Sequence, residues 1–189
     1  MTANSRQLAL QTLIEWEHGQ FFASDIIDRL AKAGGLDHRD TALLQTLVMC
    51  VLRNMTLLDH MLDQVCDNKR LERHVHWLLR LGAAQLLLLE MPPHAAVNET
   101  VDLAQKARGL VNAVLRRIER EKATLLAQIP SLPLDDKFSQ PDWLIERWRK
   151  QYGEQNAAAL CEWNQTQPVT FIRLNQLQPA PAAIPENFE

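Results

Sequence analysis

The chain has 189 residues, with 20 Lys and Arg against 23 Asp and Glu and a formal net charge of −3. A hydrophobic fraction of 47% is ample for a buried core and excludes an intrinsically disordered chain. The charge balance excludes a protein that coats nucleic acid non-specifically, so any polyanion site must come from where the charges lie.

The sequence also argues against export and membrane insertion. Glu15 and Glu17 fall where a signal peptide would need an unbroken apolar run. The longest apolar stretch, residues 77–91, contains Arg80 and Glu90 and is shorter than the ~20 residues of a membrane span. We therefore expect a cytoplasmic protein with no membrane partner.

Helical periodicity of apolar residues begins near the N-terminus. Asn4 or Ser5 can cap the first helix, the pair Gly34-Gly35 can end the second, and Asn54 interrupts the third. The first five predicted helices run from residue 5 to about 18, over 23–33, over 37–53, from 54 or 56 to 65, and over 71–91.

Two further helices are predicted as a hairpin. Pro92 and Pro93 can open a helix near His94, because proline has the helical φ and the missing N–H lacks an intrahelical partner there anyway. Gly109 then breaks the apolar pattern, and we expect it to end this helix in the left-handed conformation before the next begins. Seven helices before Pro130 and no convincing strand predict an all-α bundle.

The hairpin carries polar residues that its packing pattern does not require. Asn is a poor helix former, so Asn98 and Asn112 inside apolar helices suggest specific partners. We expect Asn98, Glu99 and Asn112 to be structural polar residues, with the amides bonding neighbouring helices. Direct ligand contact is the alternative.

Basic residues are concentrated at the end of the same hairpin. Residues 105–122 hold six basic and two acidic side chains, a local surplus that suits a surface facing phosphates. Exposed ion pairs on a solvated helix face are the alternative. The residues predicted to contact RNA are Arg6, Arg53, Arg108, Arg116, Arg117 and Arg120.

No catalytic centre is predicted in these residues. Cys50 and Cys161 lie among apolar residues, and Cys66 precedes an aspartate, so none has the positive surroundings of a nucleophilic thiolate. His74 and His76 form an HxH pair, but residues two apart do not share a helix face, so we expect no metal site. There is no Gly-x-Gly loop after a strand to hold a cofactor.

The second part of the chain is predicted to be a separate unit. We expect a helical domain over residues 1–129, a linker with little helical pattern over 130–140, and a Pro-rich tail over 176–189. Between them, residues 141–175 hold two short helices and one strand of an incomplete next domain. The strand is read from Val169, Phe171, Arg173 and Asn175, and the side chains expected to dock on the bundle are Trp143, Leu144, Trp148 and Tyr152.

Six sequence blocks carry a resemblance to a known family. In chain order they are RDTALLQTLVMCVLR, LLRLGAAQLLLL, PPHAAVNETVDLA, GLVNAVLRR, PDWLIERWRKQYG and PVTFIRLN. With these blocks the chain resembles the NusB-like N-terminal domain of the RsmB/Sun/Fmu family of 16S rRNA cytosine-C5 methyltransferases. The resemblance covers roughly residues 5–175.

The resemblance implies a function for the chain. Such enzymes follow the helical domain with a ferredoxin-like segment and a Rossmann-like catalytic domain that binds S-adenosylmethionine and attacks cytosine through a cysteine. We therefore expect an RNA-binding, positioning domain at the front of a longer small-subunit rRNA methyltransferase. Its expected partners are ribosomal RNA and the catalytic domain, with no cofactor in these residues.

Two other functions remain open from the sequence. One is a free-standing NusB-like factor that regulates transcription by antitermination through a ribosomal protein, as relatives implied by the resemblance do. The other is a structural helical module that touches no RNA.

Overall fold

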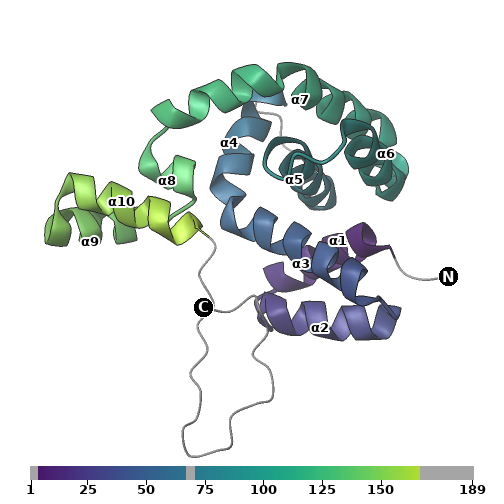
Figure 1. The fold of residues 1–189 in the computed structure, drawn as a ribbon. Coiled ribbons are helices and arrows are strands. Elements are labelled where there is room, and N and C mark those ends of the chain that lie inside the picture. Colours follow the sequence, from purple (N-terminus) through teal and green to yellow (C-terminus); the bar gives the residue numbers. More distant parts are fainter. Residues whose placement is uncertain (1–3, 67–70, 167–189) are drawn as a thin grey trace, which may run out of the picture.

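The computed structural model describes residues 4–66 and 71–166, and every regular element in them is helical (Figure 1). Ten α-helices and two 3-10 turns follow one another in these ranges, without a strand. Seven of the α-helices precede Pro130. The predicted all-α class is confirmed. The strand predicted around Val169 and the tail over 176–189 lie outside the described residues.

The first three helices pack together at one end of the bundle: α1 (Ser5–Glu17), α2 (Ala23–Gly34) and α3 (His38–Arg53) (Figure 1). The Asn4 side chain caps α1 by accepting a hydrogen bond from the backbone N–H of Arg6 at 2.8 Å. Gly35, at φ 64°, ends α2 in the left-handed region that was expected for the glycine pair. Asp37 caps α3.

The central helix is α5 (Arg73–Leu87), which packs against α1, α3, α4 (Met55–Val65), α6 (Pro93–Leu103) and α7 (Arg108–Gln128). Gly82 lets α7 approach closely, because a Cβ at this position would lie 2.6 Å from a methyl carbon of Leu115. The helix is shorter than predicted, since it ends at Leu87 and Glu90 turns the chain at φ 48°. Pro92 follows two residues later and disfavours a continuing helix.

The predicted hairpin consists of α6 (Pro93–Leu103) and α7 (Arg108–Gln128), joined by η1 (Gln105–Ala107). The prediction that Gly109 ends the first helix is wrong. Gln105 is the left-handed residue, at φ 42°, and Gly109 lies in the first turn of α7. Ala104, the residue that follows the end of α6, is buried in the core.

The stretch 130–140 is more ordered than a linker with little helical pattern. It contains most of η2 (Ile129–Ser131) and the short α8 (Leu134–Phe138), which packs against α4. Asp136 lies 3.3 Å from the His60 ring, and the Ser139 hydroxyl accepts a hydrogen bond from the Leu57 backbone N–H at 3.1 Å. Ser139 thus supplies the side-chain cap that α4 lacks at Asn54.

A second hairpin, α9 (Asp142–Tyr152) and α10 (Glu154–Gln165), follows and turns at Gly153 with φ 80°. The expected docking on the bundle is wrong for Trp143 and Tyr152, which are 65% and 51% exposed, whereas Leu144 and Trp148 are half-buried. The two helices instead bury Ile145, Ala157 and Cys161. The hairpin packs against α8.

Among the described helices, no single one has the length and apolar composition to span a membrane. By those two criteria alone, only α3 and α4 taken together would do so, and they are bent by 76° where they meet.

Candidate nucleic-acid interface

Helix α7 has one face in the core and the opposite face in solvent (Figure 1). Val111, Leu115 and Ile118 are fully buried, at the three- and four-residue spacing of one helix face. Asn112 and Arg120 are exposed and Arg116 is half-buried, and the same spacing puts these three on the outer face. The outer face of α7 is defined here by Asn112, Arg116 and Arg120.

The cations on this face are weakly engaged by the protein. Arg116 pairs with Glu119 at 2.9 Å, one turn along the helix. Arg120 makes no ion pair with any described residue. A surface pair of this kind contributes only ~0.2–1 kcal/mol, so the Arg116 guanidinium can be released to an incoming phosphate.

Other predicted RNA-contacting arginines lie near the ends of α7 and elsewhere. Arg108, at the start of α7, is exposed and pairs with Asp102 of α6. Arg117 points away from the outer face: it donates to the Val65 carbonyl at 2.7 Å and pairs with Glu121 at 3.0 Å. Arg53 is exposed at the end of α3. Arg117 therefore does not share the outer face with Arg116 and Arg120, whereas Arg108 lies one turn before Asn112 on the same side of α7.

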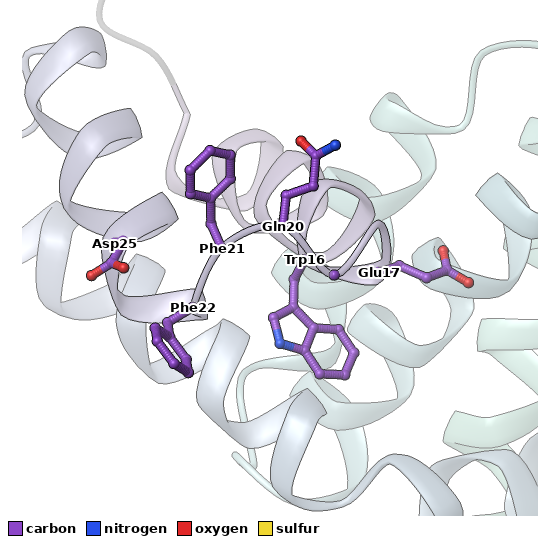
Figure 2. Close-up of a pocket in the computed structure, with 7 residues that line it drawn as sticks. Trp16, Glu17, Gln20, Phe21, Phe22 and Asp25 are labelled. Atoms are coloured by element: carbon purple, nitrogen blue, oxygen red, sulfur yellow. The ribbon is translucent and has the colours of Figure 1, made fainter.

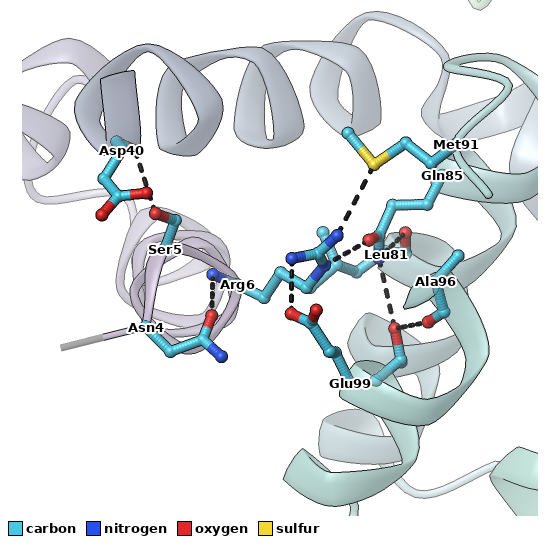
Figure 3. A network of polar contacts seen from close by, with 10 residues as sticks. Asn4, Ser5, Arg6, Asp40, Leu81, Gln85, Met91, Ala96 and Glu99 are labelled. Atoms are coloured by element: carbon cyan, nitrogen blue, oxygen red, sulfur yellow. Dashed lines mark hydrogen bonds and ion pairs between the residues drawn. The ribbon is translucent and has the colours of Figure 1, made fainter. Parts of the chain in front are cut away.

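Arg6 lies inside the helix contact, with only 11% of its side chain exposed (Figure 3). Its guanidinium donates to Gln85 Oε1 at 2.6 Å and pairs with Glu99 at 2.5 Å. The Gln85 amide in turn donates to the Thr100 hydroxyl at 3.2 Å, and both of these side chains are buried. Arg6 therefore joins α1 to α5 and α6, and its hydrogen-bonding capacity is used within the protein.

The three predicted structural polar residues have different surroundings. Glu99 links two helices through Arg6. Asn98 and Asn112 are both exposed, and Asn98 reaches only the His94 ring on its own helix, at 3.2 Å. The expectation that these two amides bond neighbouring helices is wrong, because each lies on the solvent side of its helix. Both remain available for an external partner.

Comparison with known proteins identifies the helical bundle. Residues 3–120, more than half of the chain, match the NusB family. The chain belongs to the NusB family. Residues 140–188 match the ferredoxin-like domain described as Methyltr_RsmF/B-like. The NusB bundle is therefore followed by residues that match a second family domain, and the resemblance read from the sequence blocks is confirmed.

Curated relatives are similar over most of this chain. Ribosomal RNA small subunit methyltransferase B of Escherichia coli strain K12 is 34% identical over 181 residues, which cover 92% of this chain and 41% of the relative. The protein of the same name from Escherichia coli O9:H4 strain HS gives the same figures. The chain thus spans about two fifths of the length of the curated relatives it matches.

The NusB bundle also contains a polar network that sequence reasoning missed. Asp59 of α4 accepts two hydrogen bonds from the Arg80 guanidinium, at 2.7 and 2.6 Å, and lies 3.0 Å from His76. Burial raises the pKa of Asp59, but the hydrogen bonds from His76 and Arg80 and the charge of Arg80 outweigh it, so the net pKa is lowered. Arg80 also lies 4.4 Å from the Trp77 ring centroid. Helical spacing alone does not pair residues 21 positions apart.

The thiols of Cys50 and Cys161 are poor nucleophiles. Burial raises the pKa of the Cys50 thiol to about 11, and burial likewise raises the pKa of Cys161. His76 is engaged by Asp59 and His74 is exposed, so the HxH pair does not converge on one point. Within the described ranges no group of three His, Cys, Asp or Glu side chains is placed to hold a metal ion.

A hollow of about 590 Å³ opens where α1 turns into α2 (Figure 2). Phe21 and Phe22 project from this turn and are 60% and 79% exposed. The charged residues among those lining the hollow are Glu17 and Asp25, both acidic. This end of the NusB bundle suits an apolar protein contact rather than a phosphate.

Proposed function

We propose that this chain is the RNA-binding, positioning region of a small-subunit rRNA cytosine-C5 methyltransferase, and that the outer face of α7 contacts RNA phosphates. The observation that carries the proposal is the placement of Arg116 and Arg120 on one solvent-facing side of a helix, beside the exposed Asn112, in a chain whose net charge is −3. Arg donates in a planar fork that fits phosphate oxygens, and Asn can add a neutral hydrogen bond.

Other parts of the proposal follow from the family. The relatives named above are rRNA methyltransferases, and we infer that ribosomal RNA is the substrate here and the cytoplasm the location. We assign methyl transfer and the S-adenosylmethionine it needs to residues other than Cys50 and Cys161, because burial raises the pKa of both thiols. This chain then supplies affinity and orientation to that reaction.

The proposed role has a measurable electrostatic signature. Each phosphate contact releases counterions, so the slope of log affinity against log salt reports how many contacts are made. Arg116→Gln with Arg120→Gln should weaken binding to a small-subunit rRNA fragment and reduce this slope by about 1 to 2. The matched control is Lys32→Gln with Arg39→Gln, two exposed cations on α2 and α3. The proposal would be contradicted if the two double variants changed RNA affinity and the salt slope equally, or if neither changed them.

A second candidate function is contact with a protein partner, such as the ribosomal protein that the family resemblance implies for antitermination factors. The exposed Phe21 and Phe22 favour it, since apolar side chains gathered beside a hollow mark contact surfaces. Phe21→Ser with Phe22→Ser should abolish co-purification with that partner and leave RNA affinity unchanged. Loss of RNA binding in this variant, or unchanged co-purification of the partner with it, would count against this candidate.

A further inference from the structure

A polar groove, separate from the hollow beside Phe21 and Phe22, lies next to the start of α7. It has a volume of about 450 Å³ and opens between α1, the start of α5 and the turn from α6 to α7. Its size is within the ~300–1,000 Å³ of small-ligand sites. The lining residues belong to four elements and are Gln7, Leu10, Gln11, Ile14, Glu15, His74, Asp102, Leu103 and Gln105.

Three polar side chains of this groove are free to bind. The exposed side chains of Gln7, His74 and Gln105 make no hydrogen bond to any described residue. An amide presents a donor and an acceptor side by side, which is the pattern needed to bond a base edge. The half-buried Ile14 and Leu103 supply apolar surface on which a planar ring can lie.

The backbone at Gln105 is strained, which independently marks this groove. Gln105 has φ 42°, a left-handed conformation that is unfavourable for a residue with a Cβ and clusters at binding sites. A glycine would relieve the strain, yet the chain has its nearest glycine four residues later. The strained turn presents the Gln105 amide to the groove.

Cations stand next to the groove, and its carboxylates are already paired. Lys106 is exposed and follows Gln105 directly, while Arg108 pairs with Asp102, a lining residue. Glu15 is occupied by Arg29 and by Gln11, whose amide donates to it at 2.9 Å. The groove thus combines neutral amides inside with positive charge at its edge.

We propose that this groove takes the unstacked base of a single-stranded RNA nucleotide, with Lys106 and Arg108 holding the flanking phosphates. The inference rests on the proposed function and adds the form of RNA that is bound. Along the helix axis Arg108 precedes Arg116 by about 12 Å, so one strand can pass from the groove to the outer face of α7. A duplex keeps its bases stacked and cannot enter.

The experiment compares a short single-stranded RNA with the duplex formed with its complement. The variant is Gln7→Ala with Gln105→Gly, since glycine accepts the backbone of residue 105, and the control is Gln45→Ala with Gln64→Ala, two exposed glutamines on α3 and α4. The groove variant should bind the single strand about tenfold more weakly with an unchanged salt slope. Duplex affinity should not change, and the control should behave as the parent.

A second readout does not depend on those substitutions. A 2-aminopurine placed in the single strand should change its fluorescence on binding to the parent, and His74→Ala should reduce that change. Equal affinity of parent and groove variant for the single strand would overturn the inference. If the Arg116→Gln, Arg120→Gln variant still lowered the salt slope, the proposed function would stand while the groove inference failed. If neither this variant nor the groove variant changed RNA binding, the proposed function and the groove inference would both fail.

Discussion

At the residue scale, the structure separates arginines that hold the fold from arginines that face solvent. Composition and spacing put Arg6 and Arg116 in one class, because both are cations on amphipathic helices. Arg6 is 11% exposed and bonded to Glu99 and Gln85, whereas the Arg116 side chain is 38% exposed with one surface pair. Sequence cannot make this distinction, since the partners of Arg6 lie 79 and 93 positions away.

Arg6→Ala should therefore act on stability. Removing the guanidinium leaves the buried Gln85 amide oxygen and the Glu99 carboxylate without their donor. We expect the free energy of unfolding in urea to fall by about 2 to 4 kcal/mol. Arg39→Ala, at an exposed position, should change it by less than about 0.5 kcal/mol. An Arg6 variant as stable as the parent would show that the contact is not formed.

The Asp59 network makes stability depend on pH. Because its pKa is lowered in the folded state, Asp59 contributes stability above its unfolded pKa of ~3.9 and loses it as the pH falls through the folded value. Asp59→Asn should be less stable than the parent at neutral pH, and the difference should shrink below about pH 4. Urea unfolding over a pH series measures this. A constant difference across the series would contradict the assignment.

At the element scale, α5 organises the bundle because five helices pack on it. The apolar periodicity predicted the helix, but not how closely α7 approaches it. That approach depends on Gly82, whose missing side chain leaves room for Leu115. Similarly, the turn between α6 and α7 lies at Gln105 and not at Gly109, the stronger local signal, and the neighbouring Ala104 is buried in the core. Local propensity yields to packing at both points.

Gly82→Ala tests the contact between α5 and α7. Leu115 is fully buried, so it cannot move aside freely, and we expect a loss of about 1 to 3 kcal/mol despite the better helix propensity of alanine. Leu115→Ala makes room for the new methyl group, so the double variant should lose less than the two single losses added together. Strict additivity in thermal or urea unfolding would mean that the two residues do not touch.

At the scale of the whole molecule, the sequence predicted the class of fold, the family and the seven helices before Pro130. It did not predict that the stretch 130–140 packs on α4 through Asp136 and Ser139, since those contacts join residues 76 or more positions apart. Nor did it predict that Trp143 and Tyr152 stay exposed. Periodicity reports which face of a helix is apolar, but not whether another element covers it.

The central claim, that RNA passes over the outer face of α7, is tested most directly by photocrosslinking. A photoreactive amino acid at Ala113, which is exposed one turn before Arg116, leaves every arginine in place. The matched position is Ala33, exposed near the end of α2. Irradiation with a small-subunit rRNA fragment should crosslink RNA strongly from position 113 and weakly from position 33. Equal yields, or a higher yield from position 33, would contradict the account.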